Sequence, residues 1–417
     1  MRRVLLVLPT STYRAEDFVR AAAEIGAEVV VASERRQALA GLMGDRALTI
    51  PLCRPEEAAH RIVELAARVP LDAVVAVDDQ GVVVAALAAA QLGLAHNPPS
   101  AVAATRDKAV MRQRWARAGI AQPEFRLVSS GDPGDSGADV AAAVQAIGPP
   151  VVVKPVSLSG SRGVIRADDV AGAVDAAAWA RKILAEAGVD PGAPLLIEQF
   201  VPGVEVAVEA LLRRGRLEAL ATFDKPDPLD GPYFEETIYV TPSRLPDEWL
   251  RRVHAVTAAA AAALGLVEGP VHAELRVHDS GMVRVLELAA RSIGGLCTRA
   301  LRFGAGMSLE QVILHHALDL PLDDLARERA AAGVMMLPIP SEGILRAVHG
   351  QEEARAVPGI AGLELCIPLG RPVRPLPEGH RYLGFLFARA ESPDQVEQAL
   401  RVAHARLDVE VAPCASC

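Results

Sequence analysis

The stretch Val271–Gly295, VHAELRVHDSGMVRVLELAARSIGG, decides the fold of this chain. In its first half, the polar residues His272, Glu274 and Arg276 alternate with apolar ones, which is the period of a half-buried strand. Asp279–Gly281 predicts a turn, and the apolar residues after it predict a second strand. We therefore expect a β-hairpin that gathers its polar side chains on one face.

Two glutamates are expected to meet on that face. If Ser280–Gly281 form a two-residue loop, Glu274 lies directly opposite Glu287. Their Cβ atoms would then be about 4.5–5.5 Å apart, and two like charges at that distance destabilise a hairpin unless a cation lies between them. A divalent ion held by carboxylate oxygens would supply that charge, with Arg291 as a second cation nearby. Considered alone, the pattern fits an exposed hairpin with two solvated glutamates better than it fits a metal site.

The composition describes a globular protein of several modules. The chain has 417 residues, of which 51% are hydrophobic and 23% charged, with a net charge of −9. Its length predicts three or four modules, and its dispersed lysines and arginines argue against nucleic-acid binding. Five scattered cysteines argue against a disulfide framework, and the pair Cys414 and Cys417 at the very end is expected to be a frayed tail.

The chain is expected to be cytoplasmic. The apolar run Val4–Leu8 is shorter than the roughly 7–15 residues of a signal-peptide core. No window approaches the roughly 18 apolar residues of a membrane span.

Strand and helix patterns alternate over the first hundred residues, which predicts an α/β fold with an open parallel sheet. Asp78 and Asp79 follow the strand Ala73–Val77, so they would lie at the carboxyl edge of the sheet, where ligands bind. A helix N-cap and a substrate contact explain Asp79 about equally well. No GxGxxG sequence follows the first strand, which argues against a dinucleotide site there.

The middle of the chain contains a candidate phosphate-binding loop. A single helix is predicted over Ser100–Ala118, and a short strand, Val151–Val153, ends at Lys154. The loop Ser157–Val164 that follows is rich in glycine and serine, and backbone N–H groups in such a loop can bind phosphate oxygens. Alone, such a loop is more often a plain connection. Further on, Asp224–Tyr233 is too rich in proline to predict a sheet strand.

In the order and spacing of these motifs, the chain resembles the ATP-grasp superfamily of carboxylate–amine ligases. The resemblance covers residues 1 to about 320, and the remainder is similar to the C-terminal domain of bacterial L-amino-acid ligases. It implies an ATP-grasp architecture: a pre-ATP-grasp α/β domain at 1–104, a first nucleotide-binding lobe at 105–201, a second lobe with the metal site at 202–320, and a C-terminal α+β domain at 321–417.

The resemblance also assigns roles to individual residues. It implies an ATP site formed by Lys108, Lys154, Ser159, Ser161, Gly163, Glu198, Gln199, Phe200, Val201, Glu205 and Lys225. The resemblance implies two catalytic residues. Arg291 steadies the reacting carboxylate, and Lys225, on a mobile loop, reaches the terminal phosphates. Glu274 and Glu287 hold one or two Mg²⁺ ions, for which Mn²⁺ can substitute. Many relatives have an asparagine ligand where this chain has Ala289, which leaves the number of ions open.

Four residues are candidates for substrate binding. Glu236 lies where amino-acid ligases place an acid near the substrate's ammonium group, and a solvated loop carboxylate explains it equally well. Asp79 from the first domain and Tyr239 would line the same pocket. His272 shares the polar face of the hairpin, where a supporting or exposed histidine fits better than a ligand. Cys297 is expected to be a buried structural cysteine.

The function that the resemblance implies is ATP-dependent ligation. ATP would phosphorylate a substrate carboxylate to an acyl phosphate, and an amine would then attack its carbonyl carbon, giving a dipeptide or an amino-acid amide. Covering loops at Gly160–Gly163 and Asp224–Tyr233 would exclude water. The expected partners are small carboxylates and amines and a second copy in a homodimer, with neither nucleic acid nor membrane. The alternatives are a purine-biosynthesis or carboxylase-type ATP-grasp enzyme and a non-catalytic nucleotide-binding regulator.

Overall fold

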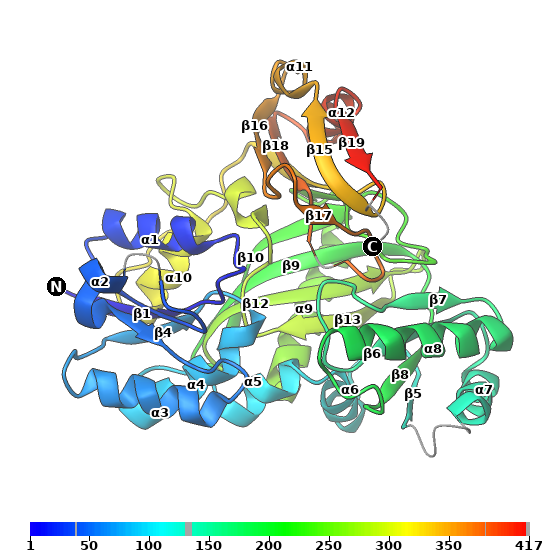
Figure 1. Cartoon of the computed structure of the whole chain (residues 1–417), viewed down its shortest axis with the longest axis horizontal. Helices are drawn as coiled ribbons and strands as arrows, with labels where there is room; N and C mark the ends of the chain where they lie inside the picture. Colours follow the sequence, from blue (N-terminus) through cyan, green and yellow to red (C-terminus); the bar gives the residue numbers. More distant parts are fainter. Residues whose placement is uncertain (38–39, 130–135, 380, 414–417) are drawn as a thin grey trace.

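The computed structural model describes residues 1–37, 40–129, 136–379 and 381–413 (Figure 1). The N-terminal region is an open parallel sheet in the order β3-β2-β1-β4, as expected. Val4 and Leu6 of β1 pack towards α1, whereas Leu5 and Val7 pack towards α3 and α4, so helices cover both faces. The elements are β1 (Arg3–Val7), α1 (Ala15–Glu24), β2 (Glu28–Ser33), α2 (Ala40–Met43), β3 (Ala47–Thr49), α3 (Pro55–Ala66), β4 (Ala73–Ala76) and α4 (Val82–Leu92).

The helix predicted over Ser100–Ala118 is wrong in one respect, because it is broken in two. Helix α5 spans Pro99–Thr105, and α6 spans Lys108–Arg117. Asp107 between them adopts an extended backbone, and its carboxylate accepts the N–H groups of Ala109 and Val110 at 2.8 and 3.0 Å. This N-cap makes Lys108 the first residue of α6.

A four-stranded antiparallel sheet in the order β5-β8-β6-β7 forms the first lobe. Val151 and Val153 of β6 pack with the apolar faces of α7 and α8, so Val152 and Lys154 point to the opposite face. Strand alternation therefore turns Lys154 away from the helices. The elements are β5 (Phe125–Val128), α7 (Ser136–Ile147), β6 (Val151–Pro155), β7 (Ile165–Ala167), α8 (Val170–Glu186) and β8 (Leu195–Gln199).

One antiparallel sheet of eight strands, in the order β13-β12-β9-β10-β11-β14-β18-β16, runs from the second lobe into the C-terminal region. The join is between β11 and β14, where Tyr239 pairs with Val334. Its strands are β9 (Val204–Arg213), β10 (Arg216–Lys225), β11 (Ile238–Thr241), β12 (Gly269–Val277), β13 (Val283–Ala289), β14 (Ala331–Leu337), β16 (Ile360–Leu365) and β18 (Gly384–Ala390). Figure 1 shows the C-terminal region, orange to red, rising above this sheet.

A smaller sheet, β17-β15-β19, completes the C-terminal region. Its strands are β15 (Gly343–His349), β17 (Pro372–Val373) and β19 (Asp408–Ala412), and the remaining helices are α9 (Asp247–Leu264), α10 (Leu309–Ala317), α11 (Gln351–Arg355) and α12 (Pro393–His404). No helix within the described ranges is long and apolar enough to cross a membrane. Cys414 and Cys417 lie outside the described residues.

The predicted hairpin forms, and Glu274 pairs with Glu287 as expected. The route to that register differs from the prediction. The N–H of His278 bonds to the carbonyl of Met282, which leaves a three-residue loop instead of Ser280–Gly281 alone. A bulge then adds one residue to β13, because Glu274 pairs with Glu287 whereas Leu275 pairs with Val285. The longer loop shifts the register by one residue, and the bulge shifts it back.

Candidate active site

A single cavity of about 370 Å³ lies where the N-terminal region, both lobes and the C-terminal region meet. Sixteen of the residues expected to form the site line this cavity, and two, Gly163 and Lys225, do not. The sixteen are Asp79, Lys108, Lys154, Ser159, Ser161, Glu198, Gln199, Phe200, Val201, Glu205, Glu236, Tyr239, His272, Glu274, Glu287 and Arg291. The fold thus brings together residues that are up to 212 positions apart in the chain, such as Asp79 and Arg291.

Two lysines line the nucleotide end of the cavity. Lys108, at the start of α6, lies 3.1 Å from the Glu287 carboxylate, and its ammonium donates to the Leu158 carbonyl at 2.7 Å. Lys154 lies 2.5 Å from Glu198. Both cations point at the same region from different elements, which is the arrangement that a polyphosphate would require.

Glu198 lines the cavity between two cations. Its side chain is 2% exposed and lies 2.5 Å from both Lys154 and the buried Arg112. Burial alone would raise the pKa of Glu198, but Arg112 and Lys154 outweigh it and lower the pKa to about 2. The carboxylate therefore fixes the position of Lys154, and Gln199, Phe200 and Val201 line the cavity beside it.

The glycine–serine loop between β6 and β7 turns only partly towards the cavity. Ser159, Gly160 and Ser161 line it, and Ser161 has a positive φ of 54°. Gly163 lies outside, because its N–H donates to the carbonyl of Pro377 in the C-terminal region at 3.1 Å. Its φ is 72°, and a Cβ there would lie 3.0 Å from Pro155, so glycine is required.

The Glu274 and Glu287 pair fits a magnesium ion. Both carboxylates line the cavity and are 24% and 34% exposed, so their oxygens are accessible. Burial would raise both pKa values, but Lys225 and His272 lower that of Glu274 to about 2, and Lys108 and Lys154 lower that of Glu287. Two ionised oxygen donors suit a hard divalent cation. Ala289 lies opposite His272 on the same hairpin and offers no oxygen ligand.

Lys225 does not lie on a mobile loop, which corrects the expectation for this residue and for part of Asp224–Tyr233. It is the last residue of β10 and is 6% exposed. Its ammonium lies 2.7 Å from Glu205, 2.5 Å from Glu236 and 3.2 Å from Glu274. Burial would lower the pKa of Lys225, but the three carboxylates raise it well above its usual value.

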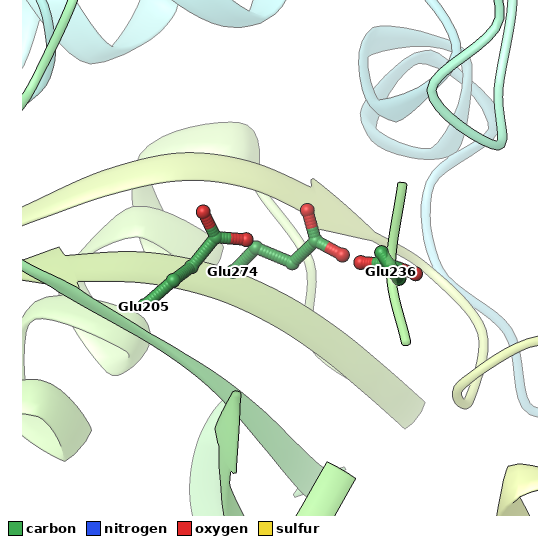
Figure 2. A group of neighbouring side chains, drawn as sticks. All are labelled: Glu205, Glu236 and Glu274. Carbon is green, nitrogen blue, oxygen red and sulfur yellow. The ribbon is translucent and has the colours of Figure 1, made fainter. Parts of the chain in front are cut away.

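Figure 2 shows these three carboxylates close together, two of them projecting from the neighbouring strands β9 and β12. One oxygen from each lies within 4.8 Å of the others, a spacing that could accommodate a metal ion. The ammonium of Lys225 already bonds to all three, so the cluster is a site for a resident cation supplied by the chain itself.

His272 links the hairpin to the loop that carries Arg291. Its Nδ1 lies 2.5 Å from Glu209, and its Nε2 lies 3.4 Å from Glu274. Burial would lower the pKa of His272, but Glu209 and Glu274 raise it to about 9, so the imidazole is charged at neutral pH. Glu209 also accepts the N–H of Ile293 at 3.0 Å. His272 is therefore a supporting residue for Glu274.

Asp79 binds Arg291, and it is not a helix cap. The carboxylate lies 2.9 Å from Arg291 and 3.1 Å from Arg106. Among the described residues, no helix N–H donates a capping hydrogen bond to it. Burial would raise the pKa of Asp79, but Arg291 and Arg106 hold it well below its usual value. Burial would lower the pKa of Arg291, and Asp79 raises it. The N-terminal region thus orients the guanidinium of Arg291 within the cavity.

Glu236 and Tyr239 lie together on the cavity wall. The Tyr239 hydroxyl donates to Glu236 at 2.6 Å. Burial raises the pKa of Glu236, and Glu274 raises it further although Lys225 lowers it. Glu236 is therefore more readily protonated than Glu274. Cys297 nearby is 3% exposed, and burial raises the pKa of its thiol, which confirms a structural cysteine.

Several residues that shape the site were not predicted. Arg276 lies 3.0 Å from Glu205, and its guanidinium lies over the ring of Phe200 at 5.4 Å. A signal existed, since Arg276 alternates with His272 and Glu274 on one face. Arg112 and Glu209 had none, because their partners are 86 and 63 residues away.

Comparison with known proteins finds family models that match this chain. Family models match three consecutive parts: an ATP-grasp N-terminal domain at residues 19–96, an ATP-grasp domain at 147–300 and an L-amino acid ligase C-terminal domain at 335–412. The crystal structure of an L-amino acid ligase from Bacillus licheniformis superposes with a TM-score of 0.79 at 23% identity and covers 99% of both chains. That likeness establishes the fold.

Two curated relatives are ligases. The alanine–anticapsin ligase of Bacillus subtilis is 26% identical over 275 residues, which are 62% of this chain and 56% of that protein. A D-alanine–D-alanine ligase of Cupriavidus metallidurans is 28% identical over 209 residues, which are 48% of this chain and 58% of that protein. The chain thus spans less than two thirds of the length of either relative. The three matching domains and their order show that the chain resembles the ATP-grasp superfamily, and its amino-acid ligases in particular.

Proposed function

We propose that the protein is an ATP-dependent ligase that activates the carboxylate of one amino acid as an acyl phosphate and joins it to an amine. The observation that supports this most is the cavity itself. Paired lysines, the Glu274–Glu287 pair and Arg291 line one space, so nucleotide, metal and carboxylate chemistry would meet there. The match to an L-amino acid ligase C-terminal domain favours amino-acid substrates over a phosphorylated or bicarbonate substrate.

The first step transfers a phosphoryl group. Lys108 and Lys154 would bind the phosphates of ATP, and Arg291 would hold the acceptor carboxylate in line with the terminal phosphate. Phosphoryl transfer depends mainly on positioning and on neutralising charge, which these fixed cations provide. Asp79 keeps the Arg291 guanidinium in one orientation, 2.9 Å away, before the substrate arrives.

The second step forms the amide. The amine nitrogen attacks the acyl carbon, the bond from that carbon to the phosphate oxygen breaks, and inorganic phosphate leaves with the bonding electrons. The nitrogen loses a proton as the bond forms. Glu236, whose pKa is raised by burial, is the carboxyl that we propose takes up this proton, and it would also bind the ammonium group of an amino-acid substrate.

Glu274 and Glu287 would hold Mg²⁺, which when bound would neutralise charge on the phosphates. Because Ala289 gives no ligand, we propose that these two carboxylates hold one ion, with Mn²⁺ as a substitute. Related structures contain ATP in one case and a magnesium salt of ADP in another.

The test is ADP release with pairs of amino acids. The full-length protein is incubated with ATP, Mg²⁺ and a panel of amino acids offered singly and in pairs, with hydroxylamine as an artificial amine in a parallel series. A ligase gives ADP with certain pairs and a hydroxamate with the acid partner alone. ATP binding without ADP release for any carboxylate would instead indicate a nucleotide-binding regulator.

A further inference from the structure

The C-terminal region supplies part of the cavity wall. The segment between β17 and β18 places Arg381 and Tyr382 on this wall, facing Tyr13 of the N-terminal region. The Arg381 guanidinium lies 5.8 Å from the centre of the Tyr13 ring. Tyr13 and Tyr382 both make edge contacts with Phe385, at 5.4 and 6.0 Å between ring centres.

This aromatic wall adjoins the cluster of Glu205, Glu236 and Glu274. The pKa of Tyr382 is raised well above its usual value by burial and by the nearby charge of Glu236. On the other side, Gly295 lies so close to Phe385 that a Cβ there would be 2.8 Å from the ring. The wall therefore borders the space between Glu236 and the loop that carries Arg291.

Arg381 differs from the other cations of the cavity in having no carboxylate partner among the described residues. Among the described residues that line the cavity, each cation except Arg381 lies within 3.1 Å of a carboxylate oxygen. These pairs are Lys108 with Glu287, Lys154 with Glu198, His272 with Glu209, Arg276 with Glu205, and Arg291 with Asp79. Arg381 has no such partner among the residues that the structure describes, so its guanidinium is free to bind an anion.

Two residues that precede Arg381, Pro377 and Glu378, make contacts with the phosphate loop and with α8. The Pro377 carbonyl accepts the Gly163 N–H at 3.1 Å, and the Glu378 carbonyl accepts the Arg162 guanidinium at 3.0 Å. The Glu378 carboxylate accepts the Trp179 indole N–H at 2.6 Å. An arginine on a segment that is anchored to the phosphate loop is better placed to orient a ligand than one on a free surface turn.

We infer that Arg381 is a specificity-determining residue whose guanidinium binds the carboxylate of the amino acid that supplies the attacking amine. The inference rests on the proposed ligase function. The amine must be uncharged when it attacks, so its ammonium charge is lost before the bond forms, and the carboxylate of the second amino acid is the charge that remains for recognition throughout the reaction. A guanidinium fork matches a carboxylate in geometry and charge, and the aromatic wall would contact its side chain.

The test compares two acceptors that differ only in the charge of the carboxylate. Wild-type protein and Arg381→Gln are assayed with the acceptor amino acid that turns over fastest in the panel, and with its carboxamide derivative. Arg346→Gln, an exposed arginine of β15, is the matched control. Arg381 is itself exposed, so the substitution should leave folding intact.

We expect Arg381→Gln to raise KM for the amino-acid acceptor by about 10- to 100-fold, the range for losing a charge-assisted hydrogen bond. KM for the carboxamide, and hydroxamate formation from the first amino acid, should stay at the wild-type values, and Arg381→Lys should fall between. Equal losses with both acceptors, or an unchanged KM for the amino acid, would overturn the inference. Absence of hydroxamate with wild-type protein would overturn the ligase function itself.

Discussion

Glu287 is the residue whose loss should separate chemistry from folding. It lines the cavity from β13 and contacts Lys108, and its side chain is 34% exposed. Glu287→Gln keeps the shape of the side chain and removes the charge that would hold a cation. We expect turnover to fall at least about 100-fold, as is typical when a fixed charge-stabilising group is lost. The melting temperature should stay near that of the wild type.

The control is Glu218→Gln, an exposed glutamate on β10 of the same sheet. Wild-type turnover in Glu287→Gln at saturating Mg²⁺ would remove Glu287 from the metal site.

Glu198 should matter for stability. It forms a buried ion pair with Arg112 and Lys154, and removing one partner of such a pair leaves an uncompensated buried charge. We expect Glu198→Gln to lower the free energy of unfolding by about 3–5 kcal/mol. The exposed pair of Glu16 and Arg20 on α1 is the control, where Glu16→Gln should cost less than about 1 kcal/mol. Urea unfolding measures both.

The loss of unfolding free energy in Glu198→Gln should depend on pH, and the sign of that dependence follows from the pKa of Glu198. The pKa of Glu198 is lowered from 4.5 to about 2 in the folded protein. Its contribution is therefore fully present above about pH 4.5 and declines as the pH falls towards 2. The stability gap between wild type and Glu198→Gln should be constant from pH 7 to 5 and narrow below that. A gap that widens on acidification would contradict the ion-pair assignment.

Among the elements, the contact between α8 and the C-terminal region should control closure over ATP. The Trp179 indole donates to Glu378, next to the carbonyls that bind Arg162 and Gly163. Trp179→Phe removes this hydrogen bond and keeps an aromatic ring, a loss of about 0.5–1.5 kcal/mol. We expect the Kd for ATP to rise by up to about tenfold. Lys182→Gln, also on α8, should leave the Kd unchanged, and an equal effect of both variants would contradict the role of the contact.

Alternation along single strands was enough to predict the hairpin and the face on which Glu274 and Glu287 meet. The details of its register were not predictable, since the three-residue loop and the bulge in β13 each shift the pairing by one residue and cancel. Helix α6 was missed as a separate element because the Asp107 cap interrupts an otherwise continuous helical pattern. Lys225 was misplaced because the proline-rich sequence after it hides the end of β10.

Across the whole molecule, the motif order was enough to predict sixteen residues that line one cavity. The ion pairs that these residues form were not predictable. Asp79 with Arg291 and Glu198 with Arg112 join separate parts of the fold, at separations that no local pattern records. The same holds for Arg381, which reaches the cavity because the large sheet continues into the C-terminal region.

The link between Asp79 and Arg291 connects the N-terminal region to the reaction. Asp79→Asn keeps the shape of the side chain and removes the charge that orients the guanidinium. We expect KM for the acid substrate to change less than about threefold while kcat falls about tenfold or more, because misplacement of a positioning group mainly affects the transition state. The exposed Asp45→Asn is the control, and a pure KM effect would indicate that Asp79 binds substrate directly.

Formation of an acyl phosphate is the central claim, and transfer of oxygen from carboxylate to phosphate tests it most directly. The acid substrate is labelled with heavy oxygen in its carboxylate, ligation is run with ATP and Mg²⁺, and the released phosphate is analysed by mass spectrometry. The proposed mechanism predicts one labelled oxygen in each inorganic phosphate, with ADP as the other product. Unlabelled phosphate, or label in AMP, would contradict it.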